Sequence, residues 1–334
     1  MRDLNRRGVI GLAGGAAAWP VLAHAQQTAP SLIGALHAAS RDGTMHLMAA
    51  YREGLKAEGF EEGRNVAIEY RWADGVFDRM PAMMADLVRL QPRVITAFGS
   101  AAYAALAARV AGKAGDIPIV MSTGSDPVSA GFVTTLNRPD NNITGATSFA
   151  VPLAAKRVEF LHELVPTVRT LAYLENPNRP APSPELERKV IETAAHAVGW
   201  QLQVVHASAV AEFDPAFSTI VREQADALII ATDTFFYSEM PRLASLAARH
   251  ALPAVGPLRD FSAAGGLMSY STSIPATYRQ SGVYTGKVLK GSRPEDLPFL
   301  LPTKFELVIN LKAAKALSLT IPLTLQLAAD EVIE

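Results

Sequence analysis

Short apolar stretches of strand length alternate with amphipathic stretches of helix length along most of this 334-residue chain. This alternation is typical of parallel sheets, because neighbouring parallel strands need a crossover connection that is usually a helix. In the first half, the predicted strands are residues 31–38, 66–72, 94–98, 117–122 and 143–147. The helices predicted between them are residues 45–58, 78–90 and 101–111. The pattern predicts an α/β fold.

The second half repeats the scheme. Its predicted strands are residues 170–174, 202–206, 227–231, 254–255 and 267–270, and its predicted helices are residues 184–198, 215–224 and 239–249. A Leu-Ala-Ala-Arg sequence at 106–109 recurs at 246–249, and each copy precedes an x-Pro strand and an Ala-Gly pair. Repetition of this kind favours two similar Rossmann-like lobes. A helix at 276–289, a strand at 305–310 and a helix at 311–317 form a tail that is too short for a domain, so we expect it to complete the lobes.

The first 25 residues have the features of an export signal. Arg2, Arg6 and Arg7 precede an apolar run over residues 9–22, and Ala-His-Ala at 23–25 is a cleavage pattern. A membrane anchor is the alternative, but the run is broken by glycine and proline and is shorter than the roughly 20 residues that span a bilayer. The Arg6–Arg7 pair also resembles a twin-arginine signal, so both the Sec and the Tat routes stay open. We predict a signal peptide at 1–25 and a periplasmic product.

The composition excludes several classes of function. The formal net charge of −1 lacks the excess of basic residues that binding to phosphate backbones needs, so no nucleic-acid partner is expected. The chain has no cysteine, which removes thiolate catalysis, zinc–thiolate sites and a lipid anchor on an N-terminal cysteine. No motif of a known catalytic class occurs, and no two of the seven histidines are spaced to share a helix face. We expect no enzyme activity, no metal and no cofactor.

Candidate ligand-binding residues of the first lobe follow its strands. Ligands of open α/β sheets bind beyond the carboxyl ends of the strands, where helix N-termini also offer free N–H groups. The residues predicted there are His37, Ser40, Gly99, Ser100, Thr123 and Asp126. Small hydroxyl residues and glycines suit a carboxylate, because the backbone can come close to it. Asp126, which precedes Pro127, has capping of a helix as its alternative role.

The second lobe offers Asn176, Asp233, Phe235 and Tyr270 at corresponding positions. Asn176 lies in an Asn-Pro-Asn sequence that is also a turn signal. Asp233 is followed by three aromatic residues at 235–237, of which one could stack on a planar ligand. Tyr270 ends a predicted strand, and an ammonium group on the ligand would find its counter-charge in Asp126 or Asp233.

Several longer stretches, spread from one end of the chain to the other, resemble sequences of a known family. They are GGAAAWP in the leader, EGRNVAIEYRWADG ending at residue 75, GSDPVSAGFVTTLNRP at 124–139, AGGLMSY at 264–270 and PTKFELVINLKAAKAL at 302–317. In these stretches the chain resembles the periplasmic substrate-binding proteins of ABC importers, in particular the tryptophan/tyrosine group.

The resemblance implies a type I periplasmic-binding fold, in which two lobes with parallel sheets are joined by three hinge crossings. The crossings would lie near 147–150, 271–275 and 301–304. The first lobe would then contain residues 30–147 and 275–301, and the second residues 148–272 and 303–334. The cleft loops of the family correspond here to the candidate residues above, except His37 and Phe235.

The function expected is capture of a small molecule, such as an amino acid or an aromatic carboxylate, for an inner-membrane permease and its ATPase. We expect a monomer. A ligand sensor of the same fold and a secreted α/β enzyme are the alternatives. The sequence does not separate a sensor from an import component, whereas an enzyme would need a base beside Ser100 or Asp126 that no histidine supplies.

Overall fold

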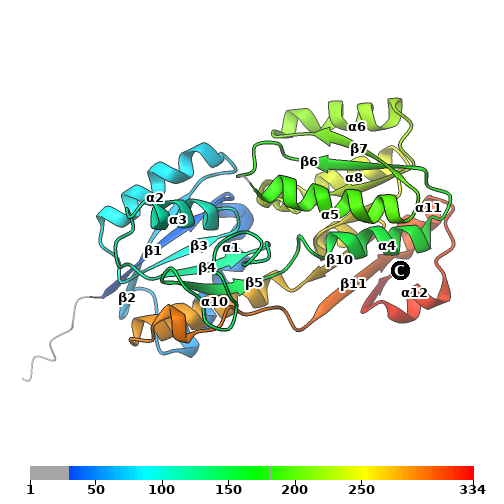
Figure 1. Cartoon of the computed structure of the whole chain (residues 1–334). Helices are drawn as coiled ribbons and strands as arrows, with labels where there is room; N and C mark the ends of the chain where they lie inside the picture. Colours follow the sequence, from blue (N-terminus) through cyan, green and yellow to red (C-terminus); the bar gives the residue numbers. More distant parts are fainter. Residues whose placement is uncertain (1–29, 181) are drawn as a thin grey trace, which may run out of the picture.

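The computed structural model describes residues 30–180 and 182–334, so the predicted signal peptide at 1–25 lies outside the described residues. Within this part of the chain the strands form two separate sheets, each covered by helices, and Figure 1 shows the resulting two lobes. The α/β fold with two Rossmann-like lobes is confirmed.

The first sheet has the strand order β2-β1-β3-β4-β5, and all its neighbouring strands are parallel. Its strands are β1 (Ser31–His37), β2 (Val66–Trp72), β3 (Val94–Phe98), β4 (Ile119–Thr123) and β5 (Ile143–Thr147). Helices α1 (Arg41–Ala57), α2 (Met80–Arg89) and α3 (Ala101–Val110) follow β1, β2 and β3 in turn. A short 3₁₀ turn (Phe77–Arg79) precedes α2. Buried apolar side chains fill both faces of this sheet.

The second sheet has the order β12-β11-β10-β9-β8-β6-β7. Its strands are β6 (Thr170–Glu175), β7 (Gln201–His206), β8 (Ala227–Ile230), β9 (Ala254–Gly256), β10 (Met268–Thr272), β11 (Phe305–Asn310) and β12 (Glu331–Ile333). Its helices are α4 (Ala154–Leu164), α5 (Ser183–Ala197), α6 (Phe213–Arg222), α7 (Thr234–Ser238), α8 (Met240–Arg249), α9 (Arg259–Ala263), α11 (Leu311–Ala316) and α12 (Leu323–Ala328). The β10–β11 pair is antiparallel, so this sheet is not wholly parallel as we expected.

Helix α10 (Ile274–Leu289) follows β10 in sequence but packs against α1 of the first lobe. The two helices approach closely because glycines face the partner backbone. A β-carbon on Gly54 would collide with the carbonyl oxygen of Arg279, and one on Gly282 would collide with that of Tyr51. This contact is why the tail of the chain divides between the lobes.

The chain passes between the sheets three times: from β5 to α4, from β10 to α10, and from Leu300 to β11. The passages are joined by hydrogen bonds. Thr272 Oγ1 donates to the carbonyl oxygen of Ser148 at 2.7 Å, and Thr147 N donates to that of Leu300 at 2.9 Å. Because three crossings join the lobes, the orientation of one lobe relative to the other can change only through backbone torsions in these crossings.

All eleven strands that the sequence pattern predicts are present, but α4, α7, α9, α12 and β12 were not predicted. The helix expected after Asp126 is absent, because residues 127–131 form only a single turn. Four of the five missed elements are six residues or shorter, which is too short for a periodic pattern to stand out.

Candidate ligand-binding site

A cavity of about 350 Å³ lies between the lobes, beyond the carboxyl ends of their strands. Its volume falls in the range of small-molecule sites, roughly 300–1,000 Å³. The first lobe contributes the ends of β1, β3 and β4 and the first turns of α1, α3 and α10, and the second lobe contributes residues around β8 and α7. Serine, threonine and tyrosine hydroxyls make up most of the polar lining.

His37 and Tyr278 form the innermost part of the first-lobe wall. The Nδ1 atom of His37 accepts a hydrogen bond from Ala39 N at 3.0 Å, and its Nε2 atom lies 2.8 Å from the hydroxyl of Tyr278. Burial lowers the pKa of His37 to about 3, so the ring is neutral at ordinary pH. Because Nδ1 accepts, the single ring proton is on Nε2, and Nε2 donates to the tyrosine oxygen.

The first turn of α3 also faces the cavity, through Gly99, Ser100 and Tyr103. No side chain caps this helix, whereas Ser40 caps α1 and Ser273 caps α10 by accepting from Gly43 N and Ala276 N. Ala102 N and Tyr103 N donate to Gly99 O and Ser100 O, so the N–H groups of Ser100 and Ala101 and the positive end of the α3 dipole are what this turn offers to a negative group in the cavity.

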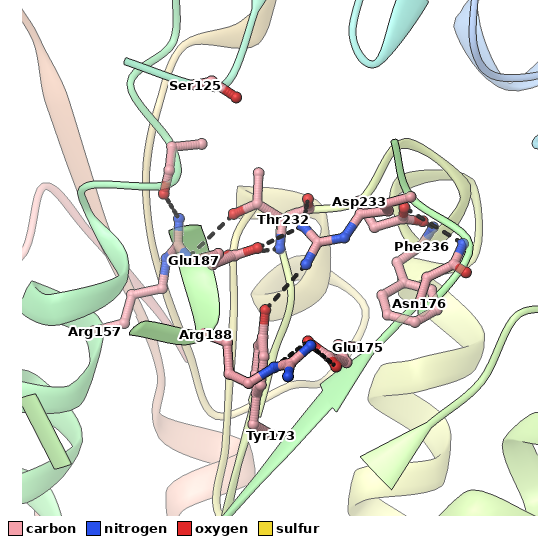
Figure 2. Close-up of polar contacts among 12 residues, drawn as sticks. Ser125, Arg157, Tyr173, Glu175, Asn176, Glu187, Arg188, Thr232, Asp233 and Phe236 are labelled. Atoms are coloured by element: carbon pink, nitrogen blue, oxygen red, sulfur yellow. Dashed lines mark hydrogen bonds and ion pairs between the residues drawn. The ribbon is translucent and has the colours of Figure 1, made fainter. Parts of the chain in front are cut away.

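Behind the second-lobe wall lies a network of buried charged side chains, which Figure 2 shows converging on Thr232. Glu187 Oε1 accepts from Thr232 N at 2.8 Å, and Nη1 of Arg179 donates to Glu187 Oε2 at 2.6 Å and to Thr232 O at 2.7 Å. Nη1 of Arg157 lies 3.4 Å from Thr232 Oγ1. Burial lowers the pKa of Arg157 and Glu187 opposes that shift, so Glu187 serves both guanidinium groups. Thr232 lines the cavity. Its N–H, its carbonyl oxygen and its hydroxyl each contact one of these buried charged side chains.

Arg157 also reaches the first crossing and strand β10. Its Nη2 atom donates at 2.8 Å to Ala150 O, in the crossing from β5 to α4, and its Nε atom donates at 3.0 Å to Tyr270 O, within β10. The Arg157 side chain is fully buried. One guanidinium group therefore contacts the cavity wall at Thr232, the first crossing and the strand that leads into the second crossing.

The lobes touch across the cavity through glycines of the first lobe. A β-carbon on Gly99 would lie 2.8 Å from Thr234 Oγ1, and one on Gly124 would lie 3.4 Å from Thr232 Cγ2. Residues 232–238 of the second lobe therefore fit against first-lobe backbone that carries no side chain. These contacts bring the two lobes together beside the cavity.

Four of the candidate residues line this cavity: His37, Gly99, Ser100 and Thr123. All four belong to the first lobe and follow β1, β3 or β4, as the carboxyl-end rule for parallel sheets indicates. The other six do not line it.

Two first-lobe candidates have structural roles. Ser40 accepts from Gly43 N at 3.4 Å as the cap of α1. Asp126 Oδ1 accepts from Val128 N at 2.8 Å and from Ser129 N at 2.9 Å, so its carboxylate is used within its own turn.

The four second-lobe candidates also face elsewhere. Asn176 Oδ1 accepts from Asn178 N in its turn, and Asp233 Oδ1 accepts from Phe236 N as the cap of α7. Burial raises the pKa of Asp233, and Arg179 opposes this shift. Phe235 stacks on Phe213 with a centroid distance of 5.6 Å, and Tyr270 stacks on Phe305 at 6.2 Å. Phe235 also lies against Gly75 of the first lobe, where an added β-carbon would be 3.5 Å from the β-carbon of Phe235, and neither ring lines the cavity.

Sequence reasoning missed Tyr103, Tyr237, Tyr278, Thr232 and the segment 271–275, all of which line the cavity. Tyr237 is the third aromatic residue after β8, and the expectation that one of the three reaches the cleft holds for it and not for Phe235. Tyr278 gives no signal in the sequence, because it reaches the cavity only when α10 packs on α1.

The lining also includes Arg259, Asp260, Glu306 and His46, none of which is buried. Among the described residues no group of His, Asp and Glu is arranged to hold a metal ion. Within the same residues, no helix is both long and apolar enough to cross a bilayer.

The sequence profile of the family described as ABC transporter substrate binding protein matches residues 33–333. The chain belongs to this family. The resemblance noted in the sequence is thereby confirmed, and the family consists of binding proteins and not of enzymes.

Individual relatives agree with this assignment. A tyrosine-binding protein of Clostridioides difficile is 25% identical over 282 residues, which cover 83% of this chain and 76% of the relative. The structure of an ABC domain in complex with L-Trp from Streptococcus pneumoniae superimposes with a TM-score of 0.77 at 23% identity, covering 91% of this chain and all of the other. A conserved domain protein from Vibrio cholerae gives a TM-score of 0.78 at 24% identity, covering 90% and 99%. These two structures share the type I periplasmic-binding fold with this chain.

Proposed function

We propose that this protein is the exported solute-binding component of an ABC importer and that it captures an aromatic amino acid between its lobes. The observation that carries the proposal is the cavity between the lobes, whose lining combines hydroxyl groups with the buried rings of His37, Tyr103 and Tyr278. An aromatic side chain needs flat apolar surface, and an amino acid also needs hydrogen-bond partners for its polar end. The ligands named for the C. difficile and S. pneumoniae relatives support this class of ligand.

The two polar requirements of such a ligand fit different parts of the cavity. The uncapped N-terminus of α3 and the hydroxyls near it suit the carboxylate. The amino group, which donates hydrogen bonds, would find acceptors among the serine and threonine hydroxyls. These hydroxyl and N–H groups are neutral. They can therefore bind a zwitterion, whose net charge is zero, without favouring a ligand of net positive or negative charge.

The proposal includes a mechanism of signalling by closure. The three crossings would act as the hinge, with residues 30–147 and 275–301 in one moving body and residues 148–272 and 303–334 in the other. A ligand that contacts both lobes shifts the population toward the closed form, which an inner-membrane permease and its ATPase then recognise. The product would be a periplasmic monomer, released from the signal peptide at 1–25.

The binding test is a thermal-unfolding screen of the purified protein against L-tryptophan, L-tyrosine, L-phenylalanine and the other amino acids. A ligand that binds only the folded protein stabilises it by about 2.7 kcal/mol at a hundredfold excess over its dissociation constant. We expect aromatic amino acids to raise the melting temperature most. A screen in which none of them stabilises the protein, or an assay in which the ligand is consumed, would contradict the proposal.

The import role needs a separate measurement. Cells that lack the gene should lose uptake of the labelled amino acid and regain it when the gene is restored. A protein that only senses the ligand would leave uptake unchanged.

A further inference from the structure

Three tyrosines line the cavity, and they differ in how their hydroxyl groups are used. The hydroxyl of Tyr103 is paired within the first lobe, because it lies 2.8 Å from Ser125 Oγ. The hydroxyls of Tyr278 and Tyr237 have no hydrogen-bond acceptor for their protons among the described residues. One belongs to α10 of the first lobe and the other to α7 of the second.

The proton of Tyr278 is free because of His37. Ala39 N–H fixes the tautomer of the ring, so Nε2 donates to the tyrosine oxygen and cannot accept from it. His37 Nε2 is the single hydrogen-bond partner that this oxygen has among the described residues. The remaining capacity of the Tyr278 hydroxyl is therefore donation of its own proton, in a wall that is almost fully buried.

Tyr237 approaches the same space from the other side. No hydrogen bond within the described residues perturbs its phenol, which burial keeps protonated by raising its pKa. Tyr237 lines the cavity from the second lobe, as Tyr278 does from the first. Tyr278 lies near enough for Tyr237 to raise its pKa, after the larger effect of burial.

We propose that Tyr278 and Tyr237 donate, one from each lobe, to a single carboxylate of the ligand. This proposal rests on the proposed function: Tyr278 and Tyr237 would make closure of the lobes depend on the carboxylate of the ligand. A carboxylate has two oxygens and lone pairs for several donors, so it can accept from both phenols and from the α3 N-terminus. Closure without an acceptor leaves the buried Tyr278 donor and the half-buried Tyr237 donor unpaired, which is unfavourable. A ligand that brings the acceptor removes this cost and thereby links occupancy to closure.

The test compares two probes that share a ring system, L-tryptophan and tryptamine, which lacks the carboxylate. Their affinities are measured by calorimetry, with competition for the weaker one, in the wild type and in Tyr278→Phe, Tyr237→Phe and Tyr103→Phe. Each substitution removes one oxygen atom and leaves the ring, so thermal unfolding without ligand should change little. Tyr103→Phe is the matched control, because its hydroxyl is already paired.

We expect Tyr278→Phe and Tyr237→Phe each to reduce the preference for L-tryptophan over tryptamine about tenfold or more, as loss of a hydrogen bond to a charged group does. Tyr103→Phe should change both affinities by the same factor. Because the two phenols share one group, the double variant should lose less than the product of the single effects. Small-angle scattering should show that L-tryptophan compacts the wild type more than it compacts either Phe variant.

Unchanged preference in both single variants overturns the inference and leaves the proposed function intact. If L-tryptophan does not bind but another carboxylic acid binds and depends on both phenols, the inference holds and the aromatic ligand is wrong. If no carboxylic acid binds the wild type, both are overturned.

Discussion

Gly43 of the first lobe lies against Ser238 of the second, so that a β-carbon on Gly43 would be 3.2 Å from the β-carbon of Ser238. Gly43 is in the first turn of α1, and Ser238 ends α7. Glycine is an unfavourable residue in a helix, so a larger residue here would favour the helix while crowding the contact between the lobes.

Substitution of Gly43 should therefore separate stability from binding. We expect Gly43→Ala and Gly43→Leu to leave the ligand-free protein as stable as the wild type or to stabilise it by up to about 1 kcal/mol. Affinity for the ligand should fall with side-chain size, roughly tenfold or more for leucine, because overpacking costs about 1–3 kcal/mol. Denaturant unfolding and calorimetry measure the two quantities. Wild-type affinity in Gly43→Leu would show that this contact is not needed for binding.

The stability of the protein should depend on pH through His37. Its pKa is lowered to about 3 in the folded protein and is near 6.5 in an unfolded chain. Between these values the unfolded chain binds a proton that the folded protein does not, so stability falls as the pH falls from about 6.5 toward 3. The contribution is about 1.4 kcal/mol for each pH unit in this window. Urea unfolding of His37→Gln from pH 7 to pH 4 should give a flatter curve, and equal slopes for the two proteins would contradict this account.

The buried network in Figure 2 should be sensitive to loss of its carboxylate. We expect Glu187→Gln to destabilise the protein by about 3–5 kcal/mol, because Arg157 would remain buried without its counter-charge and Arg179 would keep only Asp233. The control is Glu159→Gln, which breaks an exposed pair with Lys156 and should cost less than about 1 kcal/mol. Denaturant unfolding gives both values, and a similar cost for the two variants would show that the buried pair is not special.

Asp126 should matter for stability and not for binding. Its carboxylate accepts from two backbone N–H groups of its own turn, so Asp126→Ala should cost about 0.5–2 kcal/mol, as loss of a cap does. Calorimetry should show ligand affinity within about twofold of the wild type, a change of less than 0.5 kcal/mol. A tenfold loss of affinity would return Asp126 to the binding site.

The sequence predicted the strands and the lobe-level fold because short apolar runs between helical patterns need little tertiary information. It also located the first-lobe wall, since His37, Gly99, Ser100 and Thr123 follow parallel strands directly. Tyr270 could not be placed from the same pattern, because the adjacent residues Ser271 and Thr272 of β10 both line the cavity although side chains alternate along a strand.

The remaining features depend on contacts between distant parts of the chain. Tyr278 reaches the cavity only after α10 returns to the first lobe, and Thr232 is held in place by arginines and a glutamate from α4, α5 and the loop between β6 and α5. Asp233 looked like a ligand partner because a carboxylate after a strand is ambiguous, and a five-residue helix that it caps has no periodic pattern of its own.

The packing of α10 on α1 has a consequence for how the protein is made. His37 and Tyr278 form a hydrogen bond although 241 positions separate them in the sequence. During synthesis, the part of the first sheet that α10 covers stays uncovered until the chain has been made as far as residue 289, by which point β6 to β10 have already been synthesised. Contacts between such distant residues slow folding and leave apolar surface open to association. A fragment that ends at residue 147 would hold every strand of the first sheet and still be unable to bury that face.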